Sequence, residues 1–434
     1  MYRASRHHVT ISITEGRSIR DLFYNGLLDY FQEAGFDVTV FTEAVNVPTF
    51  ISQWKRPGVD FEMLFPYSFS DIQKRAFEIR RRTARLDTRL LLKGWLQLEE
   101  HILNKSRTAY VDFFRQRRTS IHLSTHVHLP HETELISSAH RANVSTVGMV
   151  RSWDNVYKGI KSRPKYLAVW NEINKQEVVD FEGYSSKHVQ IVGAPQFDPY
   201  FLPNSIWTRD KFAQRFDLDP NRPIILFATL GYFIPGNDET YWMDQLLEAI
   251  DTCAIERNPQ VICRLHPWSR YEHFEKYSSH PSVRLSYVSR YWPALTWYMT
   301  RDDVIEMANI IHHSAVVITP GSTVTLEAAI FDRPTIVPVF HGYQPDRMAN
   351  YFSNAVMGRH FGRLEELGLV PIIRDTTKFA SEINKALTHP SFYQAQRAKL
   401  VRDYVYFTDG CSTKRLAELV IELATIHPEG HRHE

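Results

Sequence analysis

Apolar side chains recur along the chain at two alternating spacings, one typical of buried strands and one typical of amphipathic helices. Residues 9–13 form a short apolar run, and residues 15–35 follow with apolar side chains at helical spacing up to Gly35. Glycine commonly ends helices, so this stretch predicts a strand and then a helix. Residues 36–42 ("FDVTVFT") predict the next strand. A strand–helix–strand unit of this kind is typical of the start of a parallel, doubly wound sheet.

The alternation of strands and helices is interrupted twice. Residues 71–118 predict a long helical insertion, and residues 194–207 are irregular and contain several prolines. A second strand–helix series begins with "PIILFATLG" at 223–231. Together with the chain length, the pattern predicts an α/β protein of two Rossmann-like domains facing across a cleft. The predicted parts are an N-terminal acceptor domain over 1–204 with the helical insertion at about 71–118, a C-terminal nucleotide domain over 205–424, and a disordered tail over 425–434.

The composition excludes several classes of protein. The 434 residues are 43% hydrophobic and 23% charged, with a formal net charge of +2, which argues against a strongly basic body bound to nucleic acid. The three cysteines lack metal-site spacing and an even count, which indicates a reducing compartment. The first residues, "MYRASRHHVTISITEG", lack the apolar core of a secretory leader, and no apolar run is long enough to span a membrane. We therefore expect a cytoplasmic protein.

Four predicted strands of the second domain end in polar or glycine residues. Ligands of open parallel sheets bind beyond the carboxyl ends of the strands, so these positions are candidates for a nucleotide site. The candidates are Thr229, Gly231, Arg264, His266, Pro267, Gly321, Ser322, Thr323 and Glu327. The helix start after Gly321 would present unpaired N–H groups and the positive end of the helix dipole to a phosphate. Glu327, about one turn further in, could accept hydrogen bonds from ribose hydroxyls.

Each of these residues also has a purely structural explanation. Gly321 and Ser322 could form a turn and a helix cap. Glu327 could be a solvated acid in a first helical turn, and His266 could simply end a strand. Their joint occurrence at predicted strand ends favours the nucleotide interpretation.

The predicted first domain should hold the acceptor and a general base, because transfer to a hydroxyl requires removal of its proton. Asp154 and Glu15 each follow a predicted strand and are the leading candidates, with His126 next. Glu15 could instead be a first-turn acid, and Asp154 could cap a turn. The residues expected on the acceptor side are Gly16, Arg17, Asn155 and His126. We expect His266 to act in catalysis from the second domain, by stabilising charge on the departing nucleotide.

No metal site and no cofactor are expected. The histidines of "HVHLPHE" (126–132) lack the helical pairing typical of zinc ligands. A leaving diphosphate could be neutralised by a helix dipole and by cationic side chains instead.

Several motifs carry a resemblance to a known class of enzymes. "RLHP" (264–267), followed by "VVITPGSTVTLEAAIFDRPTIV" (316–337), resembles the nucleotide-sugar domain of GT-B glycosyltransferases, and more narrowly bacterial capsule and surface-polysaccharide transferases. The His-Pro motif is also similar to that of CDP-glycerol glycerophosphotransferases and bacterial polysialyltransferases. In the first half, "SWDNVYKG" (152–159), "YLAVWNE" (166–172) and "VGAPQFDPY" (192–200) resemble the same surface-glycan transferases. The resemblance covers nearly the whole chain.

The resemblance implies roles for individual residues. Arg264 and His266 would contact the nucleotide phosphates. Ser322 and Thr323 would hold the diphosphate, and Glu327 the ribose.

The chain departs from two patterns within this resemblance. Retaining GT-B enzymes often carry a second acid at a fixed separation from the first, but Thr319 and Thr335 stand at that separation from Glu327. This departure favours an inverting reaction. Teichoic-acid polymerases usually have an acid and paired serines where this chain has "PGST" (320–323), which weakens the case for glycerol phosphate as the transferred group.

The sequence therefore predicts a metal-independent, inverting transferase that moves a sugar from a nucleotide-sugar donor to a surface-glycan or lipid-linked acceptor. Three alternatives stand beside it: a polymerase that uses a CDP-polyol donor, a nucleotide-sugar 2-epimerase, and a non-catalytic protein that binds sugar nucleotides. No nucleic-acid partner is expected.

Residues 74–93 are strongly basic on a helical pattern. The ordinary interpretation is a solvated face above an apolar stripe of Phe77, Ala84 and Leu91. The alternative is a docking face for an anionic lipid-linked acceptor, or peripheral contact with the inner face of a membrane.

Overall fold

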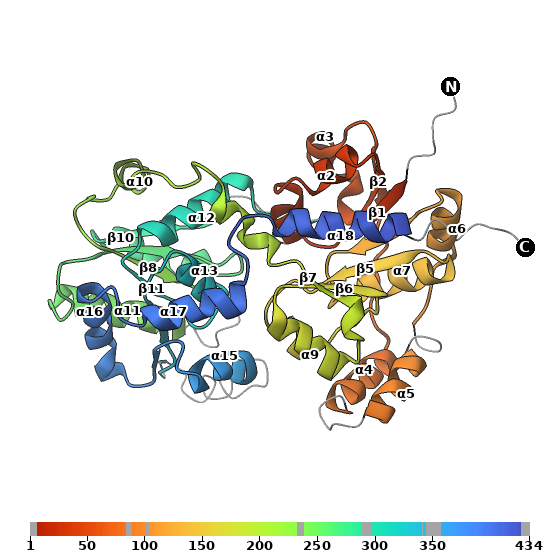
Figure 1. Ribbon diagram of the computed structural model, residues 1–434. Helices are drawn as coiled ribbons and strands as arrows, with labels where there is room; N and C mark the ends of the chain where they lie inside the picture. Colours follow the sequence, from red (N-terminus) through yellow and green to blue (C-terminus); the bar gives the residue numbers. More distant parts are fainter. Residues whose placement is uncertain are drawn as a thin grey trace, which may run out of the picture. The chain divides into compact units, whose positions relative to one another are not determined.

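The computed structural model describes residues 7–83, 89–99, 104–231, 238–288, 295, 297–340, 342–343 and 357–426. The chain forms two compact units (Figure 1). Unit 1 comprises residues 1–198, 291–298 and 409–434, and unit 2 comprises residues 199–290 and 299–408. Each unit has its own sheet and its own apolar core.

Unit 1 is built on a seven-stranded sheet with the order β3-β2-β1-β4-β5-β6-β7, in which every pairing is parallel. Its strands are β1 (His8–Ile13), β2 (Asp37–Thr42), β3 (Val59–Met63), β4 (Ile121–Ser124), β5 (Ser145–Met149), β6 (Tyr166–Val169) and β7 (Val189–Ile191). Its helices are α1 (Gly16–Ser18), α2 (Leu27–Glu33), α3 (Pro48–Trp54), α4 (Asp71–Thr83), α5 (Arg89–Leu98), α6 (Thr108–Gln116), α7 (Pro130–Arg141), α8 (Asn155–Lys158), α9 (Glu172–Glu182) and α18 (Ser412–Ile426). All residues of β1 and β4 are buried, as expected for central strands covered on both faces.

Unit 2 has a six-stranded parallel sheet with the order β10-β9-β8-β11-β12-β13. Its strands are β8 (Ile224–Ala228), β9 (Gln260–Arg264), β10 (Val283–Ser286), β11 (Val316–Ile318), β12 (Thr335–Pro338) and β13 (Ile372–Ile373). Its helices are α10 (Arg209–Phe216), α11 (Asp238–Asp251), α12 (Arg301–His313), α13 (Val324–Ile330), α15 (Met357–Glu366), α16 (Phe379–Thr388) and α17 (Gln394–Leu400). The two sheets confirm the predicted α/β class with two Rossmann-like domains. The predicted insertion at 71–118 contains helices α4, α5 and α6.

The end of the chain differs from the prediction, which placed residues up to 424 in the second domain. Helix α18 instead belongs to unit 1, where it contacts α2, β4 and β5 (Figure 1). Its apolar side chains Leu416, Ala417 and Val420 are fully buried in the core of that unit. Burial of this apolar face is the physical reason why the chain leaves unit 2 and ends in unit 1. The helix runs to Ile426, and the rest of the predicted disordered tail lies outside the described residues.

A short segment between β10 and α12 also belongs to unit 1. Leu295 and Tyr298 are buried in the same core as β1. The boundary predicted after residue 204 falls after Asp198.

Asp198 joins this boundary to the last helix. Its two carboxylate oxygens accept hydrogen bonds from the N–H groups of Ser412 at 2.9 Å and Thr413 at 2.7 Å. These are unpaired donors of the first turn of α18, so Asp198 caps a helix that is remote in sequence. The side chain is 3% exposed.

We predict that Asp198→Ala lowers the free energy of unfolding by about 0.5–2 kcal/mol, because two buried N–H groups lose their acceptor. Urea unfolding followed by circular dichroism measures this effect. Asp375→Ala is the control, because Asp375 accepts from the N–H of Thr377 in an exposed turn that water can solvate. Equal stability of Asp198→Ala and the unmodified protein would contradict the capping role.

Candidate functional site

The order of the strands determines where each unit can bind a ligand. In unit 1 the order reverses at β1, which lies between β2 and β4, and in unit 2 it reverses at β8, which lies between β9 and β11. The crevice beyond the carboxyl ends of the strands at such a switch point is the usual ligand site of an open parallel sheet. The turns after β1 and β4, and those after β8 and β11, are therefore the candidate sites.

Glu15, after β1, and His126, after β4, come together in unit 1. Arg17 binds the Glu15 carboxylate through Nε at 3.0 Å and Nη2 at 2.6 Å, and Nδ1 of His126 lies 3.6 Å from the same oxygen. Burial, together with the charges of Arg151 and Arg17, holds the pKa of His126 well below its usual range. The imidazole is therefore neutral at neutral pH and can accept a proton. Glu15 lies close enough to stabilise the resulting cation.

The segment before α12 supports this turn. A Cβ added at Gly16 would lie 2.4 Å from the Cα of Tyr298, so only glycine fits at this position. The guanidinium of Arg17 lies over the ring of Trp297, 4.2 Å from its centroid. Gly16, which we expected on the acceptor side, thus allows close packing, and Trp297 holds the guanidinium that binds Glu15.

A buried network lies next to this pair. Arg151 donates from Nη1 to Ser18 Oγ at 2.9 Å and from Nη2 to Asp21 Oδ2 at 2.5 Å, and the hydroxyls of Ser18 and Thr125 are 3.0 Å apart. Burial lowers the pKa of Arg151 to about 10, which still leaves it charged at neutral pH. These residues were not among the candidates predicted from the sequence. Arg151 follows the strand run "VSTVGMV" (144–150) and the strand-end rule could have found it, whereas Asp21 lies inside a helical pattern and gives no such signal.

Glu132, in the first turn of α7, was also missed. Its carboxylate accepts a hydrogen bond from Ser12 Oγ at 2.6 Å and is fully buried. Burial raises its pKa to about 7. In the sequence it resembles an ordinary first-turn acid, and only its burial distinguishes it.

Asp154 is already neutralised by a neighbour. Its Oδ2 lies 2.5 Å from Nζ of Lys158. Asp154 is the N-cap of the short helix α8 and Lys158 is its last residue. Asn155, the first residue of this helix, is buried. Asp154 therefore already has a cationic partner, and it remains a candidate base beside Glu15 and His126.

In unit 2, His266 and Pro267 follow β9 next to the turn after β8. The N–H of His266 donates to Thr229 Oγ1 at 2.8 Å, and the N–H of Trp268 donates to Nδ1 of His266 at 3.1 Å. Because Nδ1 accepts, a neutral His266 carries its proton on Nε2, which becomes a donor. Gly231 permits this arrangement, since a Cβ there would lie 3.2 Å from Nδ1 of His266 and the residue has a φ of +74°.

The turn after β8 is occupied by an acid of the protein itself. The N–H groups of Leu230 and Gly231 donate to the two carboxylate oxygens of Glu239, at 3.1 Å for Gly231. Glu239 is 4% exposed, and burial raises its pKa to about 8. Nucleotide contacts of Thr229 and Gly231, as predicted from the sequence, would therefore require displacement of bonds that these residues already make.

The turn between β11 and α13, unlike the turn after β8, has N–H groups that no acid of the protein binds among the described residues. Gly321 has a φ of +93°, in the left-handed region that favours glycine. The Ser322 hydroxyl bonds to Thr319 Oγ1 at 2.9 Å and accepts from the N–H of Val324 at 3.2 Å. Within the described part of the chain, the N–H groups of residues 321–323 donate to no protein acceptor. Three unused donors at the positive end of α13 suit an anion.

Glu327 is oriented by Tyr200, a residue of the "VGAPQFDPY" motif for which the sequence predicted no role. The hydroxyl of Tyr200, the last residue of "VGAPQFDPY", donates to Oε2 of Glu327 at 2.9 Å. This bond fixes a carboxylate one turn beyond the unused N–H groups. Unused N–H donors beside a fixed carboxylate suit a phosphate with an adjacent ribose.

Arg264 lies at the end of β9 and is 5% exposed. Its Nη1 donates to Ser286 Oγ at 2.7 Å and lies 3.4 Å from Glu306 Oε1, whereas Nη2 is buried and has no acceptor among the described residues. Burial lowers the pKa of Arg264, and the charge of Glu306 opposes this shift. The guanidinium is thus held in place with one edge unsatisfied, which is a favourable state for binding an anion.

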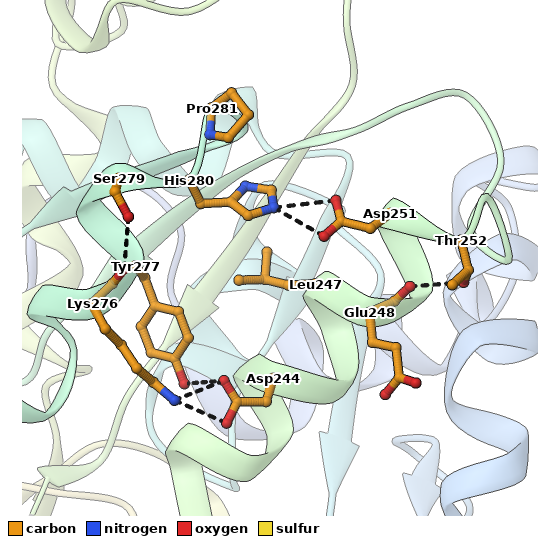
Figure 2. A pocket seen from close by; sticks show the side chains of 10 residues that line it. All are labelled: Asp244, Leu247, Glu248, Asp251, Thr252, Lys276, Tyr277, Ser279, His280 and Pro281. Atoms are coloured by element: carbon orange, nitrogen blue, oxygen red, sulfur yellow. Dashed lines mark hydrogen bonds and ion pairs between the residues drawn. The ribbon is translucent and has the colours of Figure 1, made fainter.

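A hollow of about 630 Å³ on unit 2 lies apart from these residues. It is formed by α11 and the turn η9 (Glu275–Ser279) before β10 (Figure 2). Two of its carboxylates already have partners in the hollow. Oδ1 of Asp244 accepts from Nζ of Lys276 at 3.0 Å and from the hydroxyl of Tyr277 at 2.7 Å, and Oδ1 of Asp251 lies 3.2 Å from Nε2 of His280. These pairs leave no set of unused donors for a phosphate, so the candidate site remains at the strand ends.

Two further observations concern metals and membranes. Among the residues described here, no group of three or more His, Cys, Asp or Glu side chains could hold a metal ion. His128 instead bonds through Nδ1 to the carbonyl of Gly159 at 2.7 Å. No helix in the described ranges is long and apolar enough to cross a membrane.

Solved structures with the same architecture include three kinds of enzyme. The UDP-GlcNAc 2-epimerase of Neisseria meningitidis, bound to UDP-GlcNAc, has a TM-score of 0.59 at 12% identity, over 96% of this chain and 100% of that one. The wall teichoic acid polymerase TagF with CDPG has a TM-score of 0.55 at 12% identity, over 98% and 91%. A glycosyltransferase from Rickettsia africae has a TM-score of 0.54 at 10% identity, over 97% and 99%. At these identities the likeness establishes the fold alone.

Comparison with curated protein sequences finds no match. A family model does match, over residues 88–422, and it describes the CDP-glycerol:poly(glycerophosphate) glycerophosphotransferases. This match confirms the resemblance carried by the His-Pro motif and indicates a transferase. Since the match spans well over half of the sequence, the chain belongs to the CDP-glycerol:poly(glycerophosphate) glycerophosphotransferase family.

Proposed function

We propose that this protein is a metal-independent transferase in which unit 2 binds a nucleotide-activated donor and unit 1 binds and activates an acceptor hydroxyl. The observation that carries the proposal is the turn after β11, where three N–H groups are unused and Tyr200 orients Glu327. This arrangement suits a diphosphate that carries a ribose. The acceptor is a surface glycan or a lipid-linked precursor of one.

On the donor side, the N–H groups of residues 321–323 bind the diphosphate and Glu327 accepts from the ribose. Negative charge grows on the departing phosphate oxygens during transfer. Donors that are fixed before the reaction stabilise such charge most effectively. Nε2 of His266 and the unsatisfied edge of Arg264 supply these donors.

On the acceptor side, His126 takes the proton of the attacking hydroxyl. Its imidazole is neutral at neutral pH, and Glu15 stabilises the cation that forms. We assign the base to His126 and not to Asp154, a leading candidate from the sequence, because Asp154 already forms an ion pair with Lys158.

The family membership favours a CDP-linked polyol as the donor. In that reaction the acceptor oxygen attacks the phosphorus next to the polyol, the bond to the bridging oxygen breaks, and CMP leaves. The proton of the hydroxyl goes to His126. The sequence alone favoured a nucleotide sugar as the donor, with a CDP-linked polyol as an alternative. The family membership reverses this preference.

Transfer of a sugar is the second candidate, because residues 320–323 ("PGST") depart from the pattern of teichoic-acid polymerases. In that reaction the acceptor oxygen attacks the anomeric carbon, and a nucleoside diphosphate leaves. The leaving group therefore distinguishes the two reactions.

The first prediction from this proposal concerns the product. With CDP-glycerol and a lipid-linked glycan acceptor, after exhaustive chelation of metals, we expect release of CMP in proportion to the acceptor consumed. Chromatography of the nucleotides measures it. Release of a nucleoside diphosphate from a nucleotide sugar would support the second candidate. Conversion of UDP-GlcNAc without an acceptor would indicate an epimerase, and dependence on added metal would contradict the proposal.

The second prediction concerns donor affinity. Glu327→Gln removes a charged acceptor from the ribose, which is worth about 1.5–3 kcal/mol, so CDP should bind at least about tenfold more weakly. Tyr200→Phe, which leaves the carboxylate but frees its orientation, should weaken binding less. The control is Glu382→Gln, another first-turn acid of unit 2, on α16. Calorimetric titration gives the affinities, and equal binding by Glu327→Gln and the control would remove Glu327 from the nucleotide site.

The third prediction concerns the base. His126→Gln should lower kcat by about a hundredfold or more, whereas Asp154→Asn should lower it much less. Because the pKa of His126 lies well below 6.5, activity should be constant near neutral pH and fall only as the pH drops through this low value. Arg17→Gln removes a positive charge beside the imidazole, raises its pKa and shifts the acidic limb to higher pH.

The pH dependence of kcat/KM for these three variants tests the assignment. The reverse order of effects, with Asp154→Asn inactive and His126→Gln active, would make Asp154 the base.

A further inference from the structure

The turn after β8 binds an anion that belongs to the protein itself. The N–H groups of Leu230 and Gly231 donate to separate oxygens of the Glu239 carboxylate, at 3.1 Å for Gly231. Successive N–H groups of a turn that converge on one carboxylate form the kind of concavity that also binds a phosphate oxygen. Glu239 therefore occupies a place in which unit 2 could otherwise hold a phosphate.

Glu239 is held in this place by the helix to which it belongs. It is the second residue of α11, and Trp242, Met243 and Leu246 of the same helix are fully buried in the core of unit 2. The indole N–H of Trp242 also donates to the carbonyl of Phe340 at 3.1 Å. A buried carboxylate at the start of a packed helix is a fixed part of the turn, so a ligand that reaches the turn must accommodate it.

The turn after β8 lies between the proposed diphosphate site and His266. Strands β8 and β11 are neighbours, with Phe227 paired to Ile318, so the turns that follow them lie side by side, about 4.8 Å apart at the strand ends. On its other side, a Cβ added at Gly231 would lie 3.2 Å from Nδ1 of His266. The group beyond the second phosphate of a bound donor would therefore meet the turn that Glu239 occupies.

We propose that Glu239 makes the donor site selective for nucleoside diphosphates and their esters over nucleoside triphosphates. In both candidate donors, the group beyond the second phosphate is an uncharged polyol or sugar, which can lie beside a carboxylate. In a nucleoside triphosphate this group is a third phosphate, which would find both N–H donors taken and an acid in its place. Glu239 fills this space in either protonation state. The inference rests on the proposed function, because it requires the diphosphate to lie at the turn after β11.

The test is calorimetric titration of the full-length protein with CDP and CTP, and with UDP and UTP, in the presence of a metal chelator. We expect the unmodified protein to bind each triphosphate at least about tenfold more weakly than the matching diphosphate, because the third phosphate loses water without gaining donors. Glu239→Ala frees the two N–H groups, so it should tighten triphosphate binding at least about tenfold and change diphosphate binding by less than about twofold. Glu239→Gln keeps the size of the side chain but removes its charge and one acceptor, and should give an intermediate ratio.

The matched control is Glu248→Ala, which removes an exposed acid from the same helix and changes the net charge equally. It should bind all the nucleotides as the unmodified protein does. Circular dichroism and thermal unfolding establish that the variants fold, and the ratio measured for the unmodified protein needs no variant.

The inference is overturned if the unmodified protein binds the triphosphates as tightly as the diphosphates, or if the folded Glu239 variants keep the full difference. In both outcomes binding of the diphosphate, and its weakening by Glu327→Gln, leave the proposed function intact. Failure of the diphosphates to bind, or binding that Glu327→Gln does not weaken, would instead contradict the proposed donor site and this inference with it.

Discussion

Parallel pairing of strands is the constraint on which both units depend. Parallel neighbours must be joined by crossover connections, so all strands of a sheet end on the same edge. In unit 1 the pairing of Ser12 with Ser124 aligns the ends of β1 and β4, and the turns that follow bring Glu15 and His126 within 3.6 Å. In unit 2 the pairing of Ile318 with Phe227 places the turn after β11 beside the turn after β8 in the same way.

Burial then decides the charge of the groups gathered at these edges. His126 is held neutral because its cation would lose hydration and lie close to Arg151 and Arg17. Carboxyl groups respond in the opposite direction, so burial raises the pKa of Glu132 to about 7 and that of Glu239 to about 8. The result is a neutral imidazole in unit 1 and, in unit 2, a turn after β11 whose N–H donors bind no anion among the described residues. The proposed transfer requires both features.

Unit 1 is completed by parts of the chain that are remote in sequence. Helix α18 contributes Leu416 and Val420 to its core and is capped by Asp198. Trp297, from the segment before α12, holds the guanidinium that binds Glu15. The candidate acceptor site therefore depends on residues encoded in both halves of the chain, and the family match accordingly extends almost to the end of α18.

The sequence by itself determined the alternation of strands and helices, the two Rossmann-like domains and the positions of the strand ends, because each depends on side-chain spacing within a few turns. It therefore located Glu15, His126, Ser322 and Glu327. Only the tertiary structure decided which of these groups form hydrogen bonds or ion pairs with other side chains. The bond from Tyr200 to Glu327 joins residues 127 positions apart, and the bond from Arg151 to Asp21 joins residues 130 apart. The occupation of the β8 turn by Glu239 and the packing of α18 in unit 1 likewise depend on burial and on long-range contacts, which local periodicity does not encode.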